Sequence, residues 1–264
     1  MLHKLLTSLT TGQKQYLNLL GEIANSQFKI KDQSTFFGFL WSFLHPLLIL
    51  MVLYVFFNGG IGKHVEHYAI YLLIGIIHFQ HFSNTTSASM NALYSMRQLT
   101  ANTIVPKEIL VIGVVVSNSV EFIISMLICV VIAYWSGVQF SWTVLLVPLV
   151  VLQQVIMVVW VSLFLSCLYV FVRDVAYIYQ VFLRILFFIT PTFYTPSFLG
   201  DGPARYIVLL NPLAHLISFS RTTIIEGHPF NLKLFLFFSA ANIILVFAGF
   251  RVFKSYEPRF AEHI

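Results

Sequence analysis

The sequence predicts an all-α integral membrane protein with six transmembrane helices. Hydrophobic residues make up 58% of the 264 residues, charged residues only 9%, and the mean hydropathy is +0.85. Apolar runs of about 20 residues, the length at which a helix crosses a bilayer, alternate with short polar loops. A water-soluble domain carries roughly 25% charged residues. The composition therefore excludes a soluble enzyme, a disordered chain and a nucleic-acid-binding protein.

Residues 1–38 are predicted to form a cytoplasmic amphipathic region. Apolar residues recur there at three- and four-residue spacing, as on one face of a helix: Tyr16, Leu19, Leu20, Ile23 and Ala24. Such a helix favours the membrane interface, and an ordinary solvated helix is the alternative. No signal-peptide pattern is found, so the first span is expected to direct insertion.

The six spans follow one another with short connections. They are predicted at residues 39–57, 68–90, 109–134, 143–171, 176–194 and 230–252. Pro46 falls early in the first span, where neighbouring helices can satisfy the carbonyl that it frees. The second span contains polar residues from His78 to Thr86, so it cannot face lipid on all sides.

The longest loop contains an apolar segment, residues 198–226, that is interrupted by Asn211-Pro212. Short apolar pieces broken by proline favour re-entrant helices shielded by protein. Residues 39–252 thus form the predicted transmembrane domain, and residues 253–264 a cytoplasmic tail. Ten of the 15 Lys and Arg residues lie on the side of the termini and four on the other. Since cytoplasmic loops carry the excess of positive charge, both termini are expected in the cytoplasm.

No nucleotide-binding or catalytic motif is found. The nearest approach to a phosphate-binding loop is Gly62-Lys63, where Phe57 replaces the first glycine and His64 replaces Ser or Thr. We therefore expect no catalytic residue on this chain.

No metal site is expected either. Cys129 and Cys167 lie within apolar runs, as buried packing residues do. The pairs His64/His67 and His78/His81 have a spacing that could share a metal, but no suitable third ligand accompanies them. Hydrogen-bonded polar positions are the expected alternative.

Two charged residues, Glu121 and Arg184, lie deep within predicted spans. Because a charge in the bilayer is costly, each should face a partner or a cavity. Two hypotheses follow. Glu121 and Arg184 pair or line one polar interior, or Arg184 faces a pathway for an anionic substrate.

Aromatic residues form 16% of the chain. Most are expected to pack between helices or against lipid. Some could form a stacking surface for sugar rings, whose C–H faces are apolar. These candidates are Tyr54, Phe56, Phe57, Trp160, Tyr169, Phe187, Phe188, Phe193 and Tyr194.

Four motifs, taken in order, resemble one known family. The segment Phe37–Leu48 resembles the G-x-L-W-x-x-L-x-P-L-L pattern of type-two ABC exporter permeases for cell-surface polysaccharides. These permeases export O-antigen, teichoic acid or capsule. The further matches are Pro106–Leu110, Phe171–Asp174, and Asn211-Pro212-Leu213 with Arg221. The resemblance covers about residues 15–255.

The resemblance implies a homodimeric permease in the bacterial cytoplasmic membrane. It would associate with two copies of a separate cytoplasmic ABC ATPase, which would hold ATP and Mg while this chain holds no cofactor. Its cargo would be a lipid-linked polysaccharide. The chain itself would contact membrane lipid and would bind no nucleic acid. Aromatic residues would line the path, and Arg184 is a further candidate for its lining because of its charge within a span.

The resemblance also implies roles for particular residues. The loop 95–108 would couple to the ATPase, together with the turn after the fourth span: Arg97, Pro106, Lys107, Glu108, Arg173 and Asp174. The segment before the last span would gate the external exit: Asn211, Pro212, His215 and Arg221. His45 and Arg184 depart from the family pattern.

Three alternatives remain open from the sequence alone. One is an ABC permease for a drug or lipid. Another is an ATP-independent secondary transporter or channel. The third is a multipass membrane enzyme, for which the outer loops offer only Asp201, Glu226 and His228.

Overall fold

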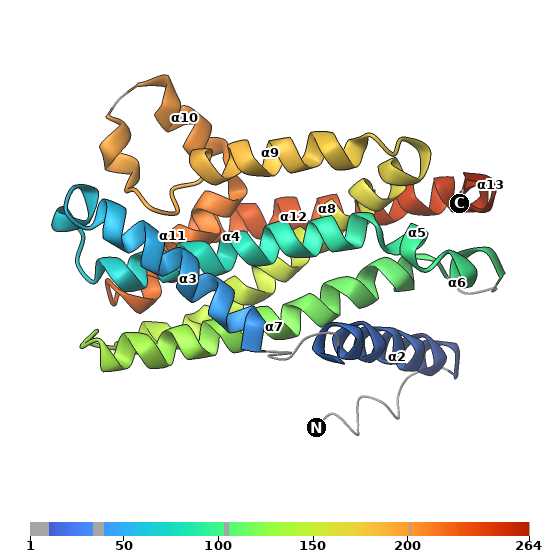
Figure 1. Ribbon diagram of the computed structural model, residues 1–264, viewed down its shortest axis with the longest axis horizontal. Coiled ribbons are helices and arrows are strands. Elements are labelled where there is room, and N and C mark those ends of the chain that lie inside the picture. Colours follow the sequence, from blue (N-terminus) through green and yellow to red (C-terminus); the bar gives the residue numbers. More distant parts are fainter. Residues whose placement is uncertain (1–10, 34–39, 103–105, 201, 264) are drawn as a thin grey trace.

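The computed structural model describes residues 11–33, 40–102, 106–200 and 202–263. Within these ranges the chain contains helices and no strand, which confirms the predicted all-α class. Phe37, Gly38 and Asp201 lie outside the described residues. The long helices run side by side along one axis (Figure 1). They are α3 (Leu40–Phe57), α4 (Tyr68–Met90), α7 (Glu108–Trp135), α8 (Val147–Phe171), α9 (Val175–Ile189) and α12 (Leu232–Tyr256).

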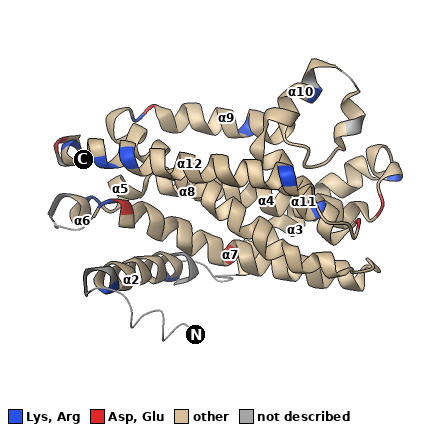
Figure 2. Cartoon of the chain, turned by 180° about the vertical axis from the view of Figure 1, so that it is seen from behind, with Lys and Arg blue, Asp and Glu red and all other residues tan. Residues whose placement is uncertain are grey.

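The remaining helices lie at the two ends of the bundle. One end holds α2 (Thr11–Gln33), α5 (Ala92–Ser95), α6 (Arg97–Asn102), η4 (Glu257–Arg259) and α13 (Phe260–His263). The opposite end holds η1 (Ile61–His64), η2 (Trp142–Leu146), η3 (Pro196–Leu199), α10 (Pro203–Leu210) and α11 (Pro212–Ile224). We call these the α2 end and the α10 end. Several Lys and Arg residues lie at the α2 end (Figure 2).

Four helical stretches of the described chain are long and apolar enough to cross a membrane. They are Leu40–Phe57, Glu108–Trp135, Trp142–Phe171 and Leu232–Arg259. The other two predicted spans correspond to α4 and α9. Polar side chains lower the hydropathy of α4, and α9 has only 15 residues. The count of six spans stays a prediction.

The predicted fifth span is five residues too long, because α9 ends at Ile189 rather than at Tyr194. Thr190 precedes Pro191 and has an extended backbone with ψ 131°. A residue before proline is disfavoured in the helical region, since the proline ring clashes with its backbone. The segment from 190 to 196 therefore leaves the helix and crosses the α10 end.

Helix α4 is the centre of the bundle. It packs against α3, α7, α8, α9 and α11. Leu72, Leu73 and Ile74 near its start are fully buried. Since burial of a leucine or isoleucine side chain stabilises a fold by roughly 1.5–3 kcal/mol, this half of α4 anchors the α10 end.

Helix α2 is present as predicted, and its apolar face packs on α7. Ile23 and Ala24 are buried there. Gly113 allows the close approach, because a Cβ at that position would lie 2.5 Å from Ile23 Cγ2. The apolar face is thus covered by protein, and the interfacial location of α2 stays a prediction.

A charged cluster joins α7 to α12 at the α2 end. Lys254 Nζ lies 2.8 Å from the Glu108 carboxylate and 3.0 Å from Glu257 Oε2. The backbone N–H of Lys107 donates to Glu257 Oε1 at 2.9 Å. The Glu108 side chain is only 6% exposed. Burial raises the pKa of nearby Tyr16, and the Glu108 carboxylate adds to that rise. Glu108 is therefore an internal contact of the fold.

We expect Lys254→Met to destabilise the protein by about 1–3 kcal/mol, because it leaves the buried Glu108 carboxylate without its cation. Thermal unfolding of the purified protein in detergent measures the effect. Lys233→Met is the matched control on the same helix, since Lys233 is exposed near the α10 end. Equal melting temperatures for the two variants would show that the Glu108 contact contributes nothing.

Candidate functional site

One face of α4 carries a stripe of polar side chains. Gln80, Ser83, Asn84 and Ser87 are spaced three or four residues apart, so they share one helix face. All four are at least partly exposed, whereas the opposite side of α4 is buried in the bundle. Helices α3 and α9 contact α4 on either side of this stripe. We call the resulting depression the α4 groove.

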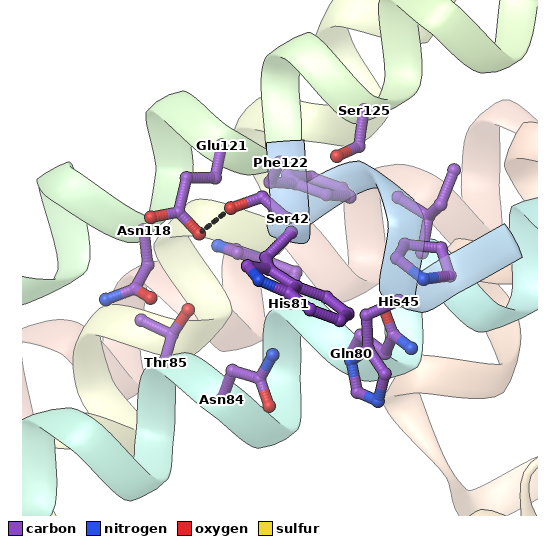
Figure 3. Close-up of a pocket in the computed structure, with 13 residues that line it drawn as sticks. Ser42, His45, Gln80, His81, Asn84, Thr85, Asn118, Glu121, Phe122 and Ser125 are labelled. Carbon is purple, nitrogen blue, oxygen red and sulfur yellow. Dashed lines mark hydrogen bonds between the residues drawn. The ribbon is translucent and has the colours of Figure 1, made fainter. Parts of the chain in front are cut away.

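The first of three adjoining cavities lies between α3, α4 and α7. Its volume is about 530 Å³, and Figure 3 shows polar side chains from all three helices around it. Glu121 of α7 accepts a hydrogen bond from the Ser42 hydroxyl of α3 at 3.1 Å. We call this cavity the Glu121 chamber. Its polar lining residues are Ser42, His45, Gln80, His81, Asn84, Thr85, Asn118, Glu121 and Ser125.

The second and third cavities continue along the stripe toward α9. A hollow of about 180 Å³ shares His45, Gln80 and Asn84 with the Glu121 chamber. A wider cavity of about 440 Å³ is lined by Arg184 and shares Ser83 with that hollow. We call the wider one the Arg184 cavity. The α4 groove thus runs from a carboxylate on α7 to a guanidinium on α9.

The structure places Glu121 and Arg184 apart within one chain. The two side chains line different cavities. The physical reason is that α4 stands between α7 and α9 and contacts both (Figure 1). A similar distance from the start of each span therefore does not bring the two charges together. They lie at the two ends of one polar groove instead.

The aromatic residues proposed for the path separate into two groups. Most surround Phe193: the ring of Phe193 lies 4.9 Å from that of Phe57 and 5.2 Å from that of Tyr194. Phe187 and Phe188 extend this group, and the Tyr54 ring lies beside it, 6.3 Å from the ring of Tyr68. Phe187 also lines the groove, so the group forms its wall at the α10 end.

Trp160 and Tyr169 belong to a different region. Trp160 Nε1 donates to Asn242 Oδ1 of α12 at 2.7 Å. Tyr169, also on α8, packs against the buried core. These two rings are absent from the lining of the three groove cavities. Phe56 is 76% exposed on the outer side of α3.

The His78/His81 pair forms hydrogen bonds with neutral side chains. The amide of Gln154 on α8 bonds both imidazoles, with its Nε2 3.1 Å from His81 Nδ1. The other nitrogen of His78 lies 2.8 Å from the Ser220 hydroxyl of α11. Among the described residues no group of three His, Cys, Asp or Glu side chains could hold a metal. The pair therefore links α4, α8 and α11.

Arg221, proposed as a gate residue, is buried and ties three segments together. Its guanidinium donates to the backbone oxygens of Tyr71, Pro191 and Thr192 at 2.6–3.1 Å. It also lies 3.3 Å from the centre of the Tyr71 ring. Cation–π contacts of this kind are strongest when desolvated. We call this the Arg221 cluster; it joins α11, α4 and the segment after α9.

The remaining proposed gate residues shape the junction between α10 and α11. The Asn211 side chain caps α11 by accepting from the Leu213 backbone N–H at 3.0 Å, and it donates to Thr190 Oγ1 at 2.8 Å. Pro212 is the first residue of α11, a position that suits its fixed φ. His215 Nε2 lies 2.8 Å from the Leu209 carbonyl oxygen. These contacts hold α10 against α11.

The residues proposed for ATPase coupling all lie at the α2 end, but they differ in exposure. Arg97 and Asp174 are exposed. The Arg173 guanidinium lies 4.7 Å from the centre of the Tyr94 ring, so the turn between α8 and α9 sits against α5. Pro106 and Lys107 are half-buried beside Glu108. The Glu108 carboxylate is buried against Lys254, and its part in coupling to the ATPase stays a prediction.

Comparison with known proteins identifies the family. The model of the ABC-2 type transporter family matches residues 19–225. The chain belongs to the ABC-2 type transporter family. The match confirms the resemblance inferred from the sequence.

Curated relatives of this ABC-2 transporter chain are similar over almost their whole length. An O-antigen export system permease protein RfbA from Myxococcus xanthus is 28% identical over 251 residues, covering 95% of this chain and 96% of the relative. Two proteins of the same name from Klebsiella pneumoniae are 27% and 26% identical, each covering 93% of this chain and 94% of the relative.

The sequence of this ABC-2 chain was not interpreted as containing a functional stripe on α4. The helical spacing of Gln80, Ser83, Asn84 and Ser87 was a usable signal, because it marks one polar face on an otherwise apolar helix. Tyr71 and Thr192 contact Arg221 through backbone oxygens, and no side-chain pattern could reveal that.

We expect Gly75→Ala to loosen the Arg221 cluster. A Cβ at Gly75 would lie 2.7 Å from Arg221 Nη2 and 2.8 Å from the Thr192 oxygen, so the segment after α9 must move. Overpacking of this kind costs about 1–3 kcal/mol. Limited proteolysis within residues 190–200 and thermal unfolding measure the change.

Gly21→Ala is the matched control for this exchange. Gly21 lies in α2 with no atom within 4 Å of an added Cβ, and alanine is the better helix former by roughly 0.5–1 kcal/mol. The control should leave proteolysis unchanged and stability equal or higher. If both variants behave alike, close packing at Gly75 is not what holds the segment.

Proposed function

We propose that this chain is the permease subunit of an ATP-driven ABC exporter that moves a lipid-linked polysaccharide across the bacterial cytoplasmic membrane. The observation that carries the proposal is the near full-length similarity to O-antigen export permeases. The α4 groove supports it, because a polar surface flanked by aromatic rings suits a long, hydroxyl-rich chain that slides past.

The proposed topology has six spans with both termini in the cytoplasm. Helices α4 and α9 are the two further spans. A helix as polar as α4 is tolerable in a membrane when protein or a water-filled path covers its polar face. The excess of Lys and Arg on the side of the termini supports the orientation, which makes the α2 end cytoplasmic. In this topology α10 and α11 form the re-entrant external gate.

A homodimer would complete the path. The outer faces of α3 and α9 are exposed and apolar, as at Val55 and Ile178. Both helices flank the polar α4 groove. If single chains faced lipid here, the polar stripe would lose its hydrogen-bonding environment at a cost of several kcal/mol per group. A second copy seated across α3 and α9 covers the stripe and encloses a path.

The driving force would come from two copies of a separate cytoplasmic ABC ATPase, which hold ATP and Mg. In this proposal Arg97, Pro106 and Lys107 with the Arg173-Asp174 turn form the coupling surface. Closure of the ATPase dimer would push α5 and α6, which connect directly to α4 and α7. Because Arg173 contacts Tyr94, the same push would reach α9 and so both walls of the groove.

Co-purification with the ABC ATPase of the same cell tests the proposal. The reconstituted complex should hydrolyse ATP faster when lipid-linked polysaccharide is present, and cells lacking the chain should retain that glycan inside. Stimulation by drugs or simple lipids instead would favour the other ABC-2 cargo classes. If no ATPase associates and transport persists without ATP, the exporter assignment is wrong.

We expect Arg97→Glu to weaken ATPase association about tenfold, because it reverses an exposed charge on the proposed coupling surface. Lys63→Glu is the matched control, since Lys63 is exposed at the opposite end of the bundle. Quantitative pull-down of the ATPase measures both variants. Equal recovery of the ATPase would rule out α6 as a docking element.

We expect Arg184→Gln to lower export while ATPase association stays normal. An arginine in a polar cavity of the path can hold the phosphate groups of a lipid-linked glycan by charge-assisted hydrogen bonds. Arg251→Gln is the matched control, because Arg251 is exposed on α12 away from the groove. Glycan export per ATP hydrolysed is the measurement, and unchanged export in Arg184→Gln would exclude such a role.

A further inference from the structure

The Glu121 chamber has the size of a ligand site. Its volume of about 530 Å³ lies within the range of roughly 300–1,000 Å³ that small-molecule pockets occupy. It forms the α7 end of the α4 groove, because His45, Gln80 and Asn84 line both the chamber and the neighbouring hollow. A group carried along the groove can therefore enter the chamber from the side.

Two side chains of the chamber lack hydrogen-bond partners. The hydroxyl of Thr85 and the amide nitrogen of Gln80 are buried, and neither has a partner among the described residues. Thr85 itself is 0% exposed. Buried polar groups are nearly always hydrogen-bonded. Both residues line the chamber (Figure 3), so a polar ligand there could satisfy a hydroxyl and an amide donor at once.

The lining favours an uncharged ligand that is rich in hydroxyl groups. Asn84, Asn118 and Ser125 supply neutral donors and acceptors, while Trp41 and Phe122 supply flat apolar surface. The described residues that line the chamber include the carboxylate of Glu121 and no Lys or Arg. Among these lining residues, a phosphate or carboxylate would meet the negative charge of Glu121 with no Lys or Arg to offset it.

We propose that the Glu121 chamber binds one uncharged sugar ring of the glycan that passes along the α4 groove. This inference rests on the proposed function. A sugar ring presents hydroxyl groups around its edge and apolar C–H faces above and below. The edge hydroxyls bond Thr85 and Gln80, and the faces pack against Trp41 and Phe122. The chamber thus holds one unit of the chain while its neighbours lie in the groove.

Ligand-observed saturation-transfer NMR on the purified full-length chain in lipid nanodiscs tests the proposal. The probe is methyl β-glucopyranoside, and methyl β-glucuronide is its anionic counterpart with the same ring. We expect millimolar binding of the neutral glycoside and at least tenfold weaker binding of the glucuronide. Binding of both with equal affinity, or of neither, overturns the proposal.

Two matched variants test the residues. Thr85→Val keeps the shape of the side chain and removes the hydroxyl, so the neutral glycoside should bind about fivefold more weakly, as expected for one hydrogen bond. Thr222→Val makes the same exchange in α11, away from the chamber, and should leave binding unchanged. Unaltered binding by folded Thr85→Val overturns the assignment of the chamber.

A competition experiment distinguishes two ligands that carry the same neutral sugar ring: a unit of the passing glycan and the headgroup of a membrane lipid. A neutral soluble oligosaccharide should displace the glycoside if the chamber accepts a unit of a passing chain. Displacement only by a glucosyl-diacylglycerol in the nanodisc would assign the chamber to a lipid headgroup and overturn the cargo assignment. The assay needs neither the ATPase nor transport. If the glycoside does not bind, the exporter proposal therefore still stands. If the glycoside binds normally but the complex shows no ATP-driven export, only the exporter proposal is refuted.

Discussion

The arrangement of the bundle depends on one constraint: the polar side chains of a helix in an apolar environment need hydrogen-bond partners. Helix α4 carries polar side chains on two faces. Its inner face is satisfied by hydrogen bonds such as those of His78 to Gln154 and Ser220. Its outer face stays open and forms the floor of the α4 groove. The helices around α4 cover the first face and leave the second face open as the groove.

Much of the fold could be predicted from the sequence, because apolar runs and their polar breaks are local signals. Each predicted span overlaps a long helix over most of its length, and the largest difference is at Pro191, where α9 ends five residues early. The motifs from Phe37 to Arg221 also gave the family. Such patterns need no knowledge of how the helices meet, and periodicity can therefore reveal them.

The candidate site was less predictable, because its contacts join residues far apart in the chain. Glu108 pairs with Lys254 across 146 residues, so an apparently exposed loop charge is internal. Arg184 and Glu121 match in depth but not in direction around the bundle. The spacing that marks the polar stripe on α4 was available. Its meaning depended on which neighbours left that face uncovered.

The Arg221 cluster has a consequence for how this protein can change over evolutionary time. Arg221 holds the segment after α9 almost entirely through main-chain oxygens, which every amino acid provides. This segment can therefore exchange its side chains without giving up its attachment to α4 and α11. The side chains of this segment can diversify, provided that the arginine, the nearby Tyr71 ring and the bare backbone of Gly75 persist.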